Sequence, residues 1–149
     1  MEILKSPEET KEFAKRFING LKPEKNRATI VGLYGELGAG KTNFTQAVAE
    51  VLGVKDTVAS PTFVIMKIYE LPLSHLELST SHFTHLIHID AYRLEKSSEL
   101  LHLGWQEIIS NPENLVLIEW PERVEDIMPE HIKINFHHKG ENEREVEIK

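Results

Sequence analysis

The chain has 149 residues, a formal net charge of −7 and no cysteine. This length suits one domain and leaves no room for a second catalytic domain, and the lack of cysteine excludes disulfides, thiol nucleophiles and cysteine-ligated zinc. The acidic balance disfavours a large nucleic-acid footprint, because phosphate contacts need clustered Lys and Arg. No apolar stretch is long enough to span a bilayer, and the first residues lack a secretory signal. We therefore expect a cytoplasmic protein that contacts neither membrane nor DNA.

The first predicted element is a helix. Its start is marked by Ser6-Pro7-Glu8-Glu9, which combines a capping box with proline at the first helical position. Apolar residues then recur on one stripe, at Phe13, Phe17, Ile18 and Leu21. We expect this helix to end near Gly20 and Pro23, ahead of the main domain core.

An apolar run over 28–34 predicts a strand, and it leads directly into a glycine-rich loop. The loop consists of Gly35, Glu36, Leu37, Gly38, Ala39, Gly40, Lys41 and Thr42, which fits the phosphate-binding pattern G-x-x-x-x-G-K-[ST]. Glycines suit such a loop because backbone N–H groups must wrap a polyphosphate where a Cβ would obstruct them. Apolar residues at helical spacing follow as far as Leu52, and Gly53 marks the end of that helix.

Two side chains of this loop suit the binding of a nucleoside triphosphate with Mg²⁺. Lys41 brings a positive charge to the β and γ phosphates, and Thr42 offers a hydroxyl to Mg²⁺. The helix that begins here points its positive end at the anion. The sequence has no N-K-x-D motif for reading guanine, so we expect ATP, and its product ADP, rather than GTP.

After this helix comes a polar turn, Ser60-Pro61-Thr62-Phe63, and then a strand over 64–69. Thr62 lies where other phosphate-loop proteins carry a segment ordered by the γ-phosphate, which makes it a candidate nucleotide contact. The alternative is an ordinary strand turn shaped by Pro61. Residues 71–84 have no clean period and are predicted to be a long loop or a hairpin connection.

Two carboxylates are placed for metal chemistry. The strand predicted over 85–90 ends at Asp90, and the apolar run over 115–118 is followed by Glu119. In an open α/β sheet such strand ends face the ligand crevice, and phosphoryl transfer to water needs Mg²⁺ and an oriented water. We predict that Asp90 holds Mg²⁺ through water as a Walker B acid and that Glu119 is a close metal partner or water activator. Their roles could be exchanged, and the alternative for each is a turn residue that ends a strand.

Three histidines, His82, His85 and His88, are evenly spaced in the same region. Side chains alternate along a strand, so His85 and His88 face opposite sides. This pattern argues against a structural zinc site and indicates surface or core-edge histidines instead.

The remaining segments predict the overall architecture. Residues 99–109 have helical spacing that Gly104 weakens, so two short helices are expected. The tail alternates over 132–136 and 146–148 around a turn at Gly140, which predicts a hairpin with one wet face. The whole is expected to be an α/β fold: a single P-loop ATPase domain over 1–149. Its central sheet would be mostly parallel, with antiparallel C-terminal edge strands and flanking helices.

Five blocks taken together resemble the bacterial TsaE (YjeE) ATPases. They are the phosphate loop, Ser60–Phe63, His88–Leu94, Glu99 with Leu103 and Gly104, and Leu117–Arg123, and they occur in family order. The resemblance implies a cytoplasmic ATPase needed for the threonylcarbamoyl modification of the adenosine 3′ of the anticodon, in tRNAs that read codons beginning with A. It also implies the partner proteins TsaD and TsaB, with tRNA engaged indirectly through them. We expect slow hydrolysis by the chain alone and stimulation by these partners.

The resemblance also assigns site residues. It places Lys41 and Thr42 at the phosphates and Mg²⁺, Thr62 in a switch-like loop, Asp90 as the Walker B acid and Glu119 beside the metal. Trp120 would lie next to the nucleotide, with a packing role as the alternative. The connection from 70 to 85 looks longer than the family's usual one.

Two other functions compete with this interpretation. One is a small kinase that transfers the γ-phosphate to a small-molecule acceptor; the other is a nucleotide-sensing module without useful turnover. A nucleotide kinase would need a basic lid segment after the second strand, which the sequence lacks.

Overall fold

Strand β2 (Thr29–Gly35), which leads into the phosphate loop, lies in the middle of the sheet. The computed structural model describes residues 1–55, 65–72 and 83–149. Over these residues the strands form one seven-stranded sheet in the order β1-β7-β6-β2-β5-β4-β3. β2 pairs in parallel with β5 (Asn114–Glu119) and with β6 (Ile132–His138), and β5 pairs in parallel with β4 (His85–Asp90). The predicted parallel core is confirmed.

The strands at both ends of the sheet are antiparallel. β7 (Arg144–Ile148) pairs with β6 as the predicted C-terminal hairpin, and β1 (Glu2–Leu4) pairs with β7. At the opposite edge β3 (Met66–Glu70) pairs with β4, so the segment between them connects a hairpin. The antiparallel direction of β3 fits the hairpin, one of the two predicted alternatives for the connection from 71 to 84. One feature goes beyond the sequence prediction: the short strand β1, which places an N-terminal segment at the edge beyond β7.

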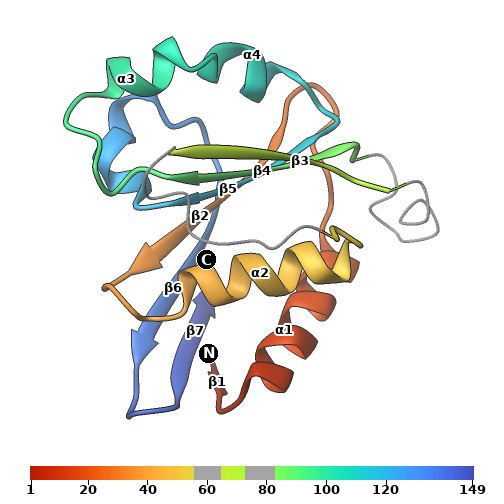
Figure 1. Ribbon diagram of the computed structural model, residues 1–149, viewed down its shortest axis with the longest axis vertical. Helices are drawn as coiled ribbons and strands as arrows, with labels where there is room; N and C mark the ends of the chain where they lie inside the picture. Colours follow the sequence, from red (N-terminus) through yellow and green to blue (C-terminus); the bar gives the residue numbers. More distant parts are fainter. Residues whose placement is uncertain (56–64, 73–82) are drawn as a thin grey trace.

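Helices cover both faces of the sheet (Figure 1). α1 (Pro7–Gly20) and α2 (Lys41–Val51) lie on one face, where they pack on each other. α3 (Ser97–His102), α4 (Trp105–Ser110) and the 3₁₀ helix η2 (Pro121–Ile127) lie on the other face. α1 begins as predicted, because the Ser6 hydroxyl accepts a hydrogen bond of 3.1 Å from the Glu9 N–H. The predicted break between two short helices is confirmed at Gly104, which has φ 89°.

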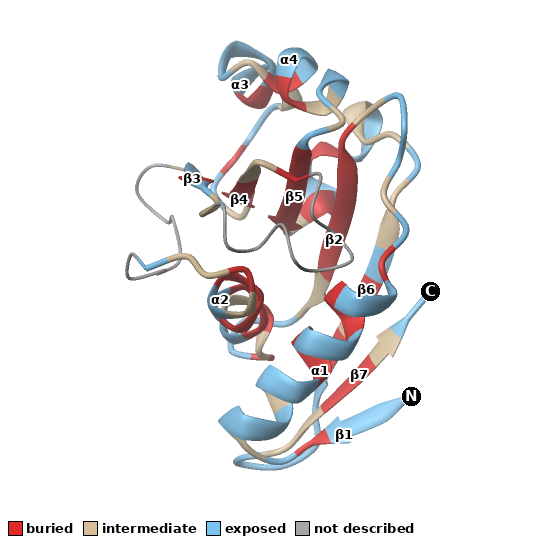
Figure 2. Ribbon diagram, turned by 90° about the vertical axis from the view of Figure 1, so that its right-hand side faces the viewer, coloured by how far each residue is buried: buried red, intermediate tan, exposed pale blue. Residues whose placement is uncertain are grey.

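The core consists of two apolar layers, one on each side of the sheet. Val31 and Leu33 of β2 join the layer under α1 and α2, whereas Ile30 joins the layer under α3 and α4. This alternation follows from the twofold side-chain period of a strand. Figure 2 shows that β2 and β5 are buried along almost their whole length. This buried central pair fixes where the ends of these strands lie, and those ends carry the candidate site.

Within the described ranges, no helix has both the length and the apolar character needed to cross a membrane. The turn that contains Thr62 lies outside the described residues, as does most of the connection from 71 to 84.

Candidate active site

The phosphate loop connects β2 to α2, and its glycines adopt backbone conformations that other residues rarely adopt. Gly35 has φ 144°, and a Cβ placed there would lie 2.5 Å from the carbonyl oxygen of Phe136. Gly38 and Gly40 also have positive φ, and Gly40 caps the start of α2. These residues fit a loop that wraps a phosphate group, because the backbone N–H groups stay unobstructed.

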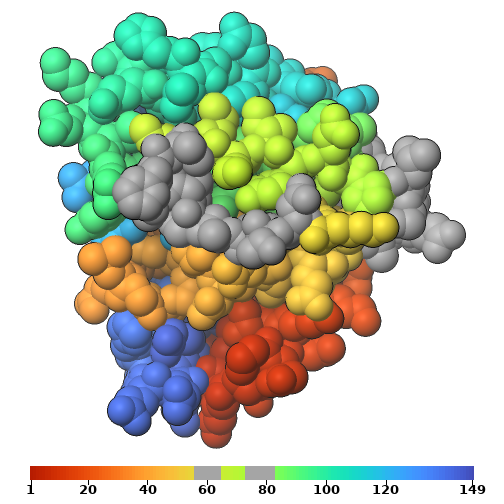
Figure 3. Space-filling model, viewed as in Figure 1, coloured from red at the N-terminus to blue at the C-terminus, as the bar shows by residue number. Residues whose placement is uncertain are grey.

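The C-terminal hairpin supports this loop. Nε2 of His138 lies 3.4 Å from the carbonyl oxygen of Leu37, and the side chain of Arg144 lies against Gly40. Leu37 itself is 63% exposed. In Figure 3 the orange loop region reaches the surface next to the blue hairpin, so the two segments share one face of the molecule.

Lys41, the first residue of α2, is buried. Its Nζ donates a hydrogen bond to the Gly35 carbonyl oxygen and lies 3.6 Å from the centre of the Trp120 ring, a cation–π contact. Burial lowers the pKa of Lys41, and the negative charges of Glu119, Glu122 and Asp90 oppose that shift. The ammonium group is therefore held inside the loop at an electrostatic cost that a bound polyanion would offset.

The two predicted carboxylates lie side by side. Asp90 at the end of β4 and Glu119 at the end of β5 are register partners, and both are buried. The Thr42 hydroxyl lies 3.1 Å from Oε1 and 3.2 Å from Oε2 of Glu119, to which it donates. Oδ1 of Asp90 accepts a hydrogen bond of 3.0 Å from the Tyr92 N–H. The structure thus places Thr42, Asp90 and Glu119 together, with Glu119 in direct contact with the loop.

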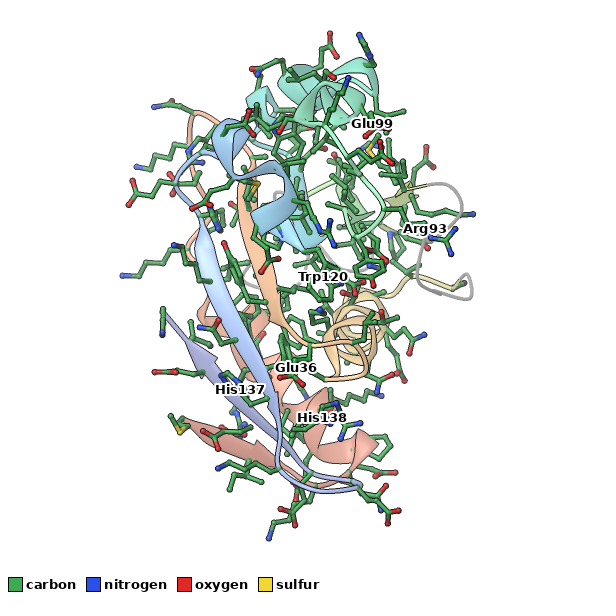
Figure 4. The ribbon with its side chains drawn as sticks, turned by 90° about the vertical axis from the view of Figure 1, so that its left-hand side faces the viewer. Glu36, Arg93, Glu99, Trp120, His137 and His138 are labelled. Carbon is green, nitrogen blue, oxygen red and sulfur yellow. The ribbon has the colours of Figure 1, made fainter. Side chains whose placement is uncertain are left out.

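Trp120 follows Glu119 and turns the chain out of the sheet. Its backbone is left-handed, with φ 60° and ψ 46°, which is uncommon for a residue other than glycine. The turn directs the indole ring over Lys41, and the Tyr92 ring packs 5.0 Å from it. Figure 4 shows Trp120 near the centre of this face, with Glu36 and His138 below it. Trp120 is therefore both a packing partner and a neighbour of the loop.

The sequence interpretation missed one residue, His88. It was expected at the surface or at the edge of the core, but it is fully buried and its Nε2 lies 2.6 Å from Oε2 of Glu119. The signal was the position of His88 two residues before Asp90, because residues i and i+2 of a strand share a face. His85 belongs to the other face and contacts Thr84 instead.

These side chains fit a nucleotide with Mg²⁺. A hydroxyl and carboxylates are hard oxygen ligands of the kind that Mg²⁺ prefers, and the ion usually takes its other ligands from phosphates and water. Over the described residues, no group of three His, Asp or Glu side chains is arranged to hold a metal ion. A magnesium site here would therefore be completed by the nucleotide.

Residues 4–146 match the family model described as threonylcarbamoyl adenosine biosynthesis protein TsaE. The chain belongs to the TsaE family.

Relatives in this family match over nearly the full chain. The tRNA threonylcarbamoyladenosine biosynthesis protein TsaE of Rickettsia typhi is 37% identical, over 100% of this chain and 94% of the relative. The protein of the same name from Bacillus subtilis is 38% identical, over 95% of this chain and 79% of the relative. The crystal structure of Bacillus subtilis YdiB superposes with a TM-score of 0.71 at 32% identity, covering 97% of this chain and 80% of that one. The fold of this chain is thus the α/β fold of a relative with a crystal structure.

Proposed function

We propose that this TsaE family chain binds ATP with Mg²⁺ and hydrolyses it, over residues 1–149 as one P-loop ATPase domain. The observation that carries the proposal is the contact between Thr42 of the loop and the buried Glu119, beside Asp90 at the end of the neighbouring strand. This contact brings the phosphate-binding end of the loop and two acids to one point. ADP would be held by the same loop after hydrolysis.

Each side chain has a distinct task in this proposal. Lys41 would contact the β and γ phosphates, and Trp120 would lie beside the nucleotide. Thr42 and the two acids would hold Mg²⁺, directly or through water, and one of the acids would orient the attacking water. The metal ion, when bound, neutralises charge that develops on the phosphoryl oxygens. Thr62 is proposed as a γ-phosphate contact from the segment before β3.

The biological role that we propose follows from the family. The hydrolysis would serve the threonylcarbamoyl modification of the adenosine 3′ of the anticodon, in tRNAs that read codons beginning with A. The chain would act in the cytoplasm with TsaD and TsaB and engage tRNA through them. Slow turnover by the chain alone fits a water-activating residue that is fully positioned only when a partner binds.

Phosphate release tests the chemistry. We expect ADP and free phosphate to form in equal amounts with no acceptor present, slowly for the chain alone and faster when TsaD and TsaB are added. E119Q and D90N should each lower the single-turnover rate on the order of 100-fold while ATP still binds. E12Q, at an exposed acid of α1, is the matched control and should leave the rate unchanged.

Two outcomes would contradict the proposal. Phosphate that appears only on an added small molecule would identify a kinase, and full rates in both E119Q and D90N would make these acids ordinary turn residues. The role in tRNA modification is tested separately, by reconstituting the reaction with TsaD, TsaB and a threonylcarbamoyl donor. The modified nucleoside should fall sharply when K41M replaces the natural chain.

A further inference from the structure

His88 is a fully buried polar side chain in the middle of the domain. It lies in β4, two residues before Asp90, the register partner of Glu119, and strand alternation puts it on the same face as Leu86 and Asp90. That face carries α2 and the phosphate loop. A buried imidazole needs a hydrogen-bond partner, and the partner of His88 is the candidate catalytic carboxylate.

Glu119 is held from two directions. Oε2 lies 2.6 Å from Nε2 of His88, and the Thr42 hydroxyl donates to both carboxylate oxygens at 3.1 and 3.2 Å. With a proton on Nε2, the ring donates to Oε2 and leaves Oε1 as the less occupied oxygen. Among the described residues, the other ring nitrogen, Nδ1, has no hydrogen-bond partner. Within the part of the chain that the structure describes, the ring therefore has a single hydrogen bond, the one to Glu119.

His88 and Thr42, the two residues that hydrogen-bond to Glu119, lie in different surroundings. Thr42 belongs to the loop that would receive the phosphates and the metal, so its environment changes with each turnover. His88 lies within the buried sheet, 0% exposed, and its environment is set by the fold. The hydrogen bond between His88 and Glu119 therefore stays the same during turnover, and it holds the Glu119 side chain in one rotamer throughout the reaction.

We propose that His88 is the positioning residue that orients Glu119, so that Oε1 faces the metal or the attacking water. This inference rests on the proposed ATPase function and adds a residue that acts through Glu119 rather than on the nucleotide. Replacing a residue that orients a metal-site side chain usually lowers the activity strongly, even though that residue does not touch the substrate. A core histidine with a purely structural role would instead change stability and leave the chemical step alone.

Two substitutions of similar length separate these roles. H88Q keeps a donor that can reach Glu119, whereas H88M has no donor and fills a comparable volume. We expect H88M to lower single-turnover phosphate release by roughly 10- to 100-fold, to need more Mg²⁺ for half-maximal rate, and to bind ATP without Mg²⁺ as the natural chain does. H88Q should recover most of the lost rate at unchanged ATP affinity.

A double-mutant cycle decides the case, because coupled residues give non-additive losses. H88M combined with E119Q should be no slower than E119Q alone. Additive losses, or a natural rate in H88M, would overturn the role of His88 while leaving the ATPase proposal intact. A natural rate in E119Q alone would likewise overturn the role of His88, whereas natural rates in both E119Q and D90N would overturn the proposed function itself. Thermal unfolding is measured in parallel, and H88L replaces H88M in the cycle should the methionine variant fail to fold.

Discussion

Lys41 combines two properties that rarely occur together, since it carries a positive charge and is only 3% exposed. Its ammonium group contacts a carbonyl oxygen and an aromatic ring, and it forms no ion pair with the residues that the structure describes. Burial is the largest influence on its pKa and lowers it. The buried charge of Lys41 therefore suits the binding of an anionic ligand and does not stabilise the fold.

K41M tests this conclusion. Methionine keeps an unbranched stem beside Trp120 but removes the charge, so we expect most ATP affinity to be lost and the free energy of unfolding to stay equal or rise. Titration calorimetry and urea unfolding measure the two quantities. K11M is the matched control, at an exposed lysine whose Nζ pairs with Glu50 at 2.7 Å. ATP binding by K41M at natural affinity, or its loss in K11M, would contradict the assignment.

The lowered pKa of Lys41 also predicts a pH dependence. Lys41 should lose its proton below the ordinary value of 10.5, whereas ATP phosphates are fully ionised above about pH 8. ATP affinity should therefore fall as the pH rises towards that value, with circular dichroism confirming that the chain stays folded.

The same titration has the opposite sign for stability. In this pH window the unfolded chain binds more protons at Lys41 than the folded chain, so the contribution of Lys41 to the free energy of unfolding rises with pH. The difference in unfolding free energy between the natural chain and K41M isolates this contribution. We expect the natural chain to gain stability relative to K41M as the pH rises. A constant difference, or a natural chain that loses stability relative to K41M at high pH, would contradict the lowered pKa.

At the scale of single elements, α1 offers a test that is independent of the nucleotide. The Ser6 hydroxyl satisfies the Glu9 N–H, and the Glu9 carboxylate accepts from the Lys5 N–H at 2.7 Å. S6A should lower the free energy of unfolding by about 1 kcal/mol, measured by urea denaturation, and leave ATP affinity unchanged. S6D keeps an acceptor at the same place and should restore stability. Equal losses in S6A and S6D would show that the cap is not the cause.

Elements with a strong local signal were predictable from the sequence. The cap of α1, the break at Gly104 and the extent of β4 each depend on neighbouring residues, and all three are confirmed. The strand β1 was not predictable, because three residues carry too little pattern and are held by pairing with β7. The direction of β3 likewise depends on its partner across the sheet rather than on its own residues.

In the candidate site, too, some residues were predictable from the sequence and some contacts were not. The loop motif identified Lys41 and Thr42, and the ends of the apolar strands identified Asp90 and Glu119, which the structure places together. The bond from His88 to Glu119 depends on the relative register of β4 and β5, which the sequence does not reveal. The position of Trp120 over Lys41 depends on a left-handed backbone at a non-glycine residue, for which the sequence carries no signal.

At the scale of the whole molecule, charge limits what the chain can bind by itself. Asp and Glu number 24 against 17 Lys and Arg, so we expect free tRNA to bind weakly and to be released further by salt. Fluorescence anisotropy with labelled tRNA, measured against salt with and without TsaD and TsaB, tests this. Submicromolar binding by the chain alone at physiological salt would contradict the prediction, as would a complex that binds no better than the chain.

The pairing of β1 with β7 joins the beginning of the described fold to its end, and Figure 2 shows the two strands side by side. Residues 2–4 find their partners only at 144–146. During synthesis, therefore, the first strand has no place in the sheet until almost the entire fold has left the ribosome. The parallel partners of β2 also come from the second half of the chain. The phosphate loop is therefore synthesised well before the strands that pair with β2, and the sheet is completed late in folding.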